Sequence, residues 1–100
     1  MKTYKQFKNS NFTCIIKDGN DIVFTSKAKG VKPLLDFLKE NYLISHKLVL
    51  FDKVIGKGAM LLAIKAGIKE IHTPLVSEPA LQLASHYQME IEYEKQVPYI

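Results

Sequence analysis

The sequence predicts an α/β protein, a three-layer α/β/α sandwich built on a five-stranded mixed sheet. Two β-rich runs joined by an Asp-Gly turn open the chain, and three later strand-like runs are each preceded by one helix-like segment. Strands separated by single helices become parallel neighbours through right-handed crossovers, whereas a hairpin adds an antiparallel edge. One hundred residues suffice for one core, so we expect a single domain over residues 1–100.

The first third of the chain contains the predicted hairpin. Residues 12–17 and 21–26 are rich in β-forming side chains, and the turn Asp18-Gly19-Asn20 joins them. Before the hairpin, the spacing of Tyr4 and Phe7 suits a short amphipathic helix packed on the body of the protein. A frayed terminus is the alternative for that segment.

The next segments predict a helix and a buried strand. Pro33 suits the first turn of a helix, and the leucines and phenylalanine that follow it form an apolar face. Asn41 or the residues just after it should end that helix. Residues 47–51 are almost wholly apolar, as expected for a strand covered on both faces.

The stretch from Phe51 to Gly67 is predicted to hold the central helix. It is apolar around most of its circumference, so it should be buried against more than one neighbour. Asp52 is expected to act as the N-cap, and Gly67 to close the last turn in the left-handed conformation. A face of small residues would let another backbone approach; it consists of Gly56, Ala59, Ala63 and Ala66. Contact with a sheet explains that face most simply, and a ligand reaching the backbone is the alternative.

The last third alternates strand, helix and strand. Residues 68–72 predict a strand that Pro74 should limit. Ser77 is a plausible N-cap for a helix over residues 78–86. Residues 90–94 alternate acidic and apolar side chains, so this strand should have one solvated face.

The composition is that of an ordinary soluble domain, with 47% hydrophobic and 24% charged residues. No apolar run approaches the ~20 residues that a membrane span needs, and the polar start at residues 1–5 lacks the core of a signal peptide. We therefore expect a cytoplasmic protein that does not enter a membrane. Cys14 is the only cysteine, which excludes an internal disulfide and a multi-cysteine metal site.

The net charge of +4 is unevenly distributed. Residues 1–32 are basic and residues 67–100 are acidic, so the two regions should attract each other within a fold or between subunits. All 14 positive side chains are lysine. Because arginine is the usual bidentate reader of bases and phosphates, its absence argues against sequence-specific nucleic-acid binding. A nucleotide-composition bias toward lysine codons is the alternative explanation of that absence. Loose, salt-dependent binding of single strands through the lysines is a further alternative.

Five segments carry a family resemblance: Asp21–Ser26, Gly30–Leu35, Asp52–Lys57, Val76–Leu81 and Val97–Ile100. In these segments the chain resembles a small prokaryotic family of uncharacterised proteins with a cytidine deaminase-like fold. The resemblance implies one deaminase-like domain and no established activity. It also allows a dimer or tetramer, because deaminase-like folds often oligomerise.

The resemblance can be tested against the chemistry of zinc deaminases. These enzymes need a His or Cys with a Glu two residues later, then Pro-Cys-x-x-Cys at the start of a later helix. The corresponding positions, Asp52–Lys57 and Ser77–Ala80, hold no such ligand set. We therefore expect no zinc, no cofactor and no deamination, and assign no catalytic residue.

Two other groups of side chains are candidates for catalysis: Cys14, and Glu78 with His72. Cys14 would need a nearby base and a lowered pKa to act as a nucleophile, and a buried strand thiol is the simpler interpretation. Glu78 and His72 have the chemistry of an acid/base pair, but nothing in the sequence fixes their geometry.

The candidate site lies where two helices should begin. The predicted strands before Asp52 and Ser77 end at the same edge of the sheet, where open α/β sheets usually bind ligands, and helix starts offer free N–H groups to an anion. We expect a small anionic or nucleotide-like ligand there. The alternative is that both residues are merely caps and the lysines are solvated. The candidate residues are Asp52, Lys53, Gly56, Lys57, His72, Ser77 and Glu78.

A second function class is a structural or regulatory module that acts through homo-oligomerisation. The helix from Ser77 with its neighbouring acidic strand, and the basic segment Lys27–Lys32, have complementary charge and would meet between subunits.

Overall fold

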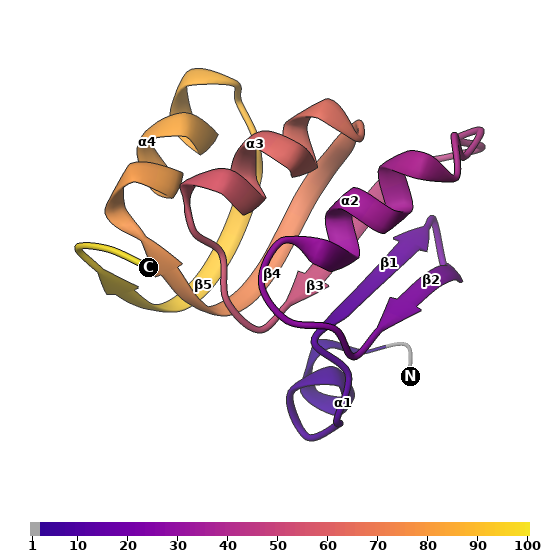
Figure 1. The fold of residues 1–100 in the computed structure, drawn as a ribbon, viewed down its shortest axis with the longest axis horizontal. Coiled ribbons are helices and arrows are strands. Elements are labelled where there is room, and N and C mark those ends of the chain that lie inside the picture. The colour runs from indigo at the N-terminus through magenta and orange to yellow at the C-terminus, as the bar shows by residue number, and fades with distance from the viewer. Residues whose placement is uncertain (1–2) are drawn as a thin grey trace.

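The computed structural model describes residues 3–100 as one twisted sheet with most of its helices on one side (Figure 1). The α/β class and the five-stranded mixed sheet are confirmed. In chain order the elements are α1 (Tyr4–Lys8), β1 (Cys14–Asp18), β2 (Asp21–Ser26), α2 (Lys32–Lys39), β3 (Leu48–Asp52), α3 (Lys57–Lys65), β4 (Ile68–Ser77), α4 (Glu78–His86) and β5 (Glu90–Val97).

The strands follow the order β2-β1-β3-β4-β5 across the sheet. β1 pairs antiparallel with β2 on one side and with β3 on the other. β3, β4 and β5 are parallel to one another, as the alternation of strands and helices predicts. The hairpin therefore supplies the antiparallel edge, and the crossover strands supply the remaining sheet.

The helices cover the two faces of the sheet unequally. α2, α3 and α4 pack over one face, where Phe37, Met60 and Ala84 belong to the main hydrophobic core (Figure 1). α1 covers the other face, where Phe7 packs with Ile15 and Phe51 in a smaller cluster. The short amphipathic helix predicted from Tyr4 and Phe7 is thus present. Among the described residues it is the only helix on that face, so the third layer of the predicted sandwich consists of α1 alone.

The hairpin turn forms as predicted and also anchors a distant loop. Gly19 has a φ of +62°, a conformation that glycine adopts without strain. Asp18, only 3% exposed, accepts hydrogen bonds from Tyr42 Oη at 2.8 Å, Ser45 N at 2.7 Å and His46 N at 2.8 Å. These donors lower the pKa of Asp18, the Ser45 N–H most strongly. The carboxylate thereby fixes the connection between α2 and β3.

The prediction that Asp52 caps the central helix is wrong. Asp52 is the last residue of β3, and α3 begins at Lys57 with Gly56 as its N-cap. Between them, Ile55 is extended and joins β4: Ile55 N donates to Leu75 O at 2.9 Å, and Ser77 N donates to Ile55 O at 3.0 Å. These bonds hold the connection in the sheet, so the N-cap of the helix lies four residues later than predicted, at Gly56. Its end agrees with the prediction, because Gly67 has a φ of +85°.

The prediction that Pro74 limits its strand is also wrong, because β4 continues to Ser77. The register pairs Thr73 with Tyr93 and Leu75 with Lys95, and gives Pro74 no partner between them. The pairing of β4 with β5 therefore continues past Pro74, which lacks the N–H group that a strand residue would donate. β5 accordingly runs to Val97 instead of ending at residue 94.

The first and last elements are joined on the α1 face of the sheet. Glu94 accepts from Tyr4 Oη through Oε2 at 2.7 Å and pairs with Lys8 Nζ through Oε1 at 2.7 Å. The predicted attraction between the basic start and the acidic end of the chain therefore exists within one molecule. This Tyr4/Lys8/Glu94 cluster ties α1 to β5.

Candidate functional site

The candidate site is a cavity of about 370 Å³ at the end of β3, beside the start of α3. β3 contributes Asp52 to its wall, and the connection to α3 contributes Val54 and Gly56. The segment before α2 forms the opposite wall with Lys29, Gly30 and Val31. Ligand pockets of small molecules commonly have volumes from about 300 to 1,000 Å³, so this cavity is large enough for a small ligand.

Asp52 is the buried acid of the cavity, with 6% of its surface exposed. Its Oδ1 accepts a hydrogen bond from Val54 N at 3.2 Å. Burial raises the pKa of Asp52 to about 7, and the backbone N–H groups of Val54 and Lys53 oppose that rise. The raised pKa brings the titration of this carboxyl toward neutral pH.

The start of α3 presents backbone donors to the cavity. The first helical hydrogen bond runs from Met60 N to Gly56 O at 3.0 Å, so the N–H groups of the three residues before Met60 precede the helical ladder. Gly56 has no side chain to cap them, and the first turn contains no acidic residue. Gly56, Lys57, Gly58 and Ala59 all line the cavity. This end of the helix is thus open to an acceptor from outside the described chain.

The three lysines of the cavity are not equivalent. Lys53 Nζ donates to Ser10 O at 2.8 Å and lies over the Phe7 ring at 5.0 Å, so its charge is directed to α1. Lys29 and Lys57 are exposed at the rim of the cavity. Lys57 also stands at the first helical position, where a positive charge opposes the helix dipole. An anion bound in the cavity would relieve that repulsion.

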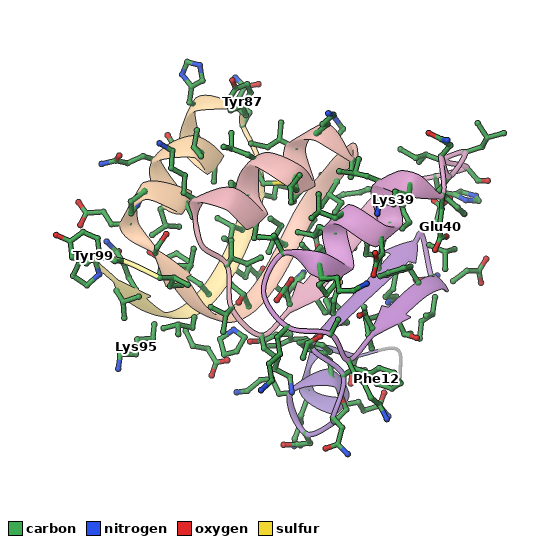
Figure 2. The ribbon with its side chains drawn as sticks, viewed as in Figure 1. Phe12, Lys39, Glu40, Tyr87, Lys95 and Tyr99 are labelled. Atoms are coloured by element: carbon green, nitrogen blue, oxygen red, sulfur yellow. The ribbon has the colours of Figure 1, made fainter. Side chains whose placement is uncertain are left out.

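The C-terminal segment returns to this site after β5. The Ile100 side chain lies against Gly56, and Ile100 lines the cavity. Tyr99 points outward and is 84% exposed (Figure 2). With Val31 and Val54, Ile100 gives the cavity an apolar part beside its charged rim.

The structure brings together four of the seven predicted site residues. Asp52, Lys53, Gly56 and Lys57 line the cavity. Ser77 caps α4, as predicted, and accepts from Ala80 N at 3.2 Å, while Glu78 follows in the first turn of that helix. These two residues are at the adjacent strand end but do not line the cavity.

His72 belongs to the α1 face of the sheet, not to the cavity. Its Nε2 lies 2.5 Å from Glu70 Oε2, and its ring packs against Phe51 with centroids 5.4 Å apart. Glu92 Oε2 lies 3.5 Å from Nδ1 on the other side of the ring. His72 is therefore paired with carboxylates from its own strand and from β5, and Glu78 is not its partner in the structure.

The structure adds cavity residues that the sequence analysis did not select. Thr13, Lys29 and Val31 come from segments far from Asp52 in sequence. Thr13 Oγ1 donates to Ala28 O at 2.6 Å, which holds the basic segment against β1. The cluster of lysines in residues 27–32 is the one sequence signal for this wall, and it predicts a charged surface without indicating a cavity.

Outside the cavity, residues 3–100 contain one further candidate nucleophile, the Cys14 thiol. Cys14 is fully buried, and burial, with a further contribution from Asp52, raises the pKa of its thiol. This environment fits the buried-thiol interpretation. No group of three His, Cys, Asp or Glu side chains in this part of the chain lies close enough together to hold a metal ion. None of the described helices is long and apolar enough to cross a membrane.

The fold and cavity define a small α/β protein with an open helix start at the edge of a five-stranded mixed sheet. The chain belongs to the DUF1893 family: the family model TM1506, a domain of unknown function, matches residues 2–100. A crystal structure of a DUF1893 family protein, TM1506 from Thermotoga maritima, is similar with a TM-score of 0.83 and 27% sequence identity. The match covers 96% of this chain and 64% of that one. No curated protein matches the chain.

Proposed function

We propose that this protein binds a small anionic or nucleotide-like ligand in the cavity beside Asp52 and the start of α3, without catalysing a reaction on it. The observation that carries the proposal is the uncapped first turn of α3, which shares the cavity with Lys29 and Lys57. Backbone N–H groups at a helix start and nearby ammonium groups both favour an anion.

The remaining walls suit the uncharged part of such a ligand. Val31, Val54 and Ile100 offer apolar contacts, and the small residues Gly56 and Gly58 allow close approach to the backbone. A ligand with an anionic group and a flat or sugar-like body would use both parts of the cavity. This arrangement supports a nucleotide-like compound as well as a simple sugar phosphate.

The proposal also includes a deaminase-like scaffold that works without zinc. The strand ends at Asp52 and Ser77 correspond to the positions where the resemblance would place the zinc-binding elements, and they carry no His or Cys ligands. The family description, a domain of unknown function, assigns no activity to these positions.

Isothermal titration calorimetry with nucleoside monophosphates and sugar phosphates tests the proposal. We expect saturable binding that weakens by up to about fivefold in Lys57→Gln, because an exposed charge beside the anion contributes up to about 1 kcal/mol of attraction. Lys65→Gln is the matched control, since Lys65 lies at the opposite end of α3 and outside the cavity. Flat traces with every ligand would overturn the proposal.

The second candidate function is assembly through complementary charged surfaces. The acidic β5 lies at one edge of the sheet, and the basic segment Lys27–Lys32 follows β2 at the other. Attraction between these two edges would join separate copies. Light scattering over rising protein concentration at low and high salt tests this: salt-sensitive oligomers support assembly, and a monomer at every concentration counts against it.

A further inference from the structure

Asp52 is the only acidic side chain among the described residues that line the cavity. Three charged groups share the lining: Lys29 before α2, Lys53 after β3 and Lys57 in α3. Lys53 is directed to Ser10 O, which leaves two lysines at the rim. From β1, the buried Cys14 is the register partner of Asp52. The cavity lining includes no titratable side chain from β4 or α4.

In this arrangement an ionised Asp52 carboxyl would repel any anion in the same cavity. We propose that Asp52 makes anion binding proton-linked: the cavity accepts an anion while this carboxyl is neutral and repels it once the carboxyl is ionised. The inference rests on the proposed function and adds the regulation of that site.

Two further observations support the linkage. Asp52 is nine-tenths buried, so a charge on it is poorly screened and acts strongly on a ligand in the cavity. Burial also raises the pKa of Asp52 to about 7, so both forms of the carboxyl are populated at neutral pH. A second negative charge nearby raises such a pKa further, and by linkage the proton then strengthens anion binding.

Sulfate is the suitable probe because its charge stays constant from pH 5.5 to 8.5, whereas phosphate titrates in this range. We expect its affinity for the 100-residue chain to fall roughly tenfold between these pH values, which corresponds to a pKa change of about one unit on binding.

Asp52→Asn replaces the titrating carboxyl with a neutral group of the same shape. We expect this variant to bind sulfate equally at both pH values, with an affinity close to that of the unmodified protein at pH 5.5. A second measurement needs no substitution: ¹³C NMR of the Asp52 carboxyl should show its pKa rising by about one unit when sulfate is added.

The outcomes separate the inference from the proposed function. Sulfate binding with the same pH dependence in both proteins, or an Asp52 pKa that sulfate leaves unchanged, would overturn the proton linkage and leave the anion site in place. No binding of sulfate, nucleotides or sugar phosphates at any pH would overturn the proposed function and the linkage with it. A flat profile in Asp52→Asn together with a tenfold fall in the unmodified protein supports both.

Discussion

Ile100 packs directly on Gly56: a Cβ atom added to Gly56 would lie 3.3 Å from both Cβ and Cγ2 of Ile100. The end of the described chain thus borders the start of α3 and the cavity beside it. Because Gly56 has an extended backbone, with a φ of −96°, other residues can adopt its conformation. Substitutions at Gly56 can therefore test the open helix start directly.

Gly56→Ser should stabilise the protein relative to Gly56→Ala by about 1 kcal/mol, because a serine hydroxyl can cap the first turn of α3. Both variants add the same Cβ contact with Ile100, so the difference between them isolates the cap. The same hydroxyl occupies N–H groups that we assign to the anion, so the serine variant should bind sulfate more weakly than the alanine variant. Urea denaturation and calorimetry measure the two effects. Equal stability and equal affinity in the two variants would show that the helix start is already satisfied.

Lys57→Glu should raise the free energy of unfolding by about 0.3 to 1 kcal/mol while weakening anion binding. An acidic residue in the first turn of α3 interacts favourably with the helix dipole, whereas it repels an anion in the cavity. Lys65→Glu, at the other end of the same helix, should lower stability by a similar amount and leave binding unchanged. Loss of stability in Lys57→Glu would contradict the proposed repulsion between Lys57 and the helix start.

The stability of the protein should depend on the ionisation of Asp52. Its folded pKa of about 7 is raised above the ordinary value of 3.8, so the folded state holds this proton more tightly than the unfolded state. The resulting stabilisation is complete below about pH 4 and is lost as pH rises through about 7, an effect of up to roughly 4 kcal/mol.

Urea denaturation from pH 4 to 8 measures the effect, with Asp52→Asn as the comparison. The variant should lack this slope, so its stability relative to the unmodified protein should increase with pH. Three other carboxyl groups have lowered pKa values, so their contribution to stability is lost as the pH falls: Asp18, Glu70 and Glu94. Both proteins contain these groups, so their effect cancels in the comparison. A constant difference between the proteins across the range would mean that folding leaves the pKa of Asp52 unchanged.

Ser77→Ala should cost about 1 kcal/mol of folding free energy. The Ser77 hydroxyl accepts from Ala80 N at the start of α4, and Ser77 is 1% exposed, so water cannot readily replace the lost partner. Ser85→Ala is the control, because Ser85 is exposed in the same helix and should tolerate alanine with little change. Anion affinity should stay unchanged in Ser77→Ala, since Ser77 does not line the cavity.

The sequence predicts those turns and helix caps that depend on residues close to one another in the chain. The Asp18-Gly19 turn and the Ser77 cap depend on residues within three positions of one another, and both are present. The structure at Asp52 and Pro74 does not follow from local signals, because pairing between distant segments decides their conformation. Ile55 forms hydrogen bonds with Leu75 and Ser77 of β4, so α3 begins later in the chain than predicted. The pairing of β4 with β5 continues on both sides of Pro74 and leaves Pro74 itself unpaired.

The site was predictable only along one stretch of the chain. Asp52, Lys53, Gly56 and Lys57 are close in sequence and line one cavity. Lys29, Val31 and Ile100 reach that cavity from other segments, which no periodicity or cap signal indicates. The hydrogen bond from Lys53 to Ser10 O also joins segments that are distant in sequence, so no local signal predicts it.

The Tyr4/Lys8/Glu94 cluster bears on how the nascent chain folds. Phe7 can settle on Ile15 and Phe51 as soon as β3 has left the ribosome, whereas Lys8 is 86 positions from Glu94. At a synthesis rate of about 5–20 residues per second, Glu94 is synthesised on the order of ten seconds after α1. We therefore expect α1 to be held first by its phenylalanine and locked by charge only when translation reaches β5.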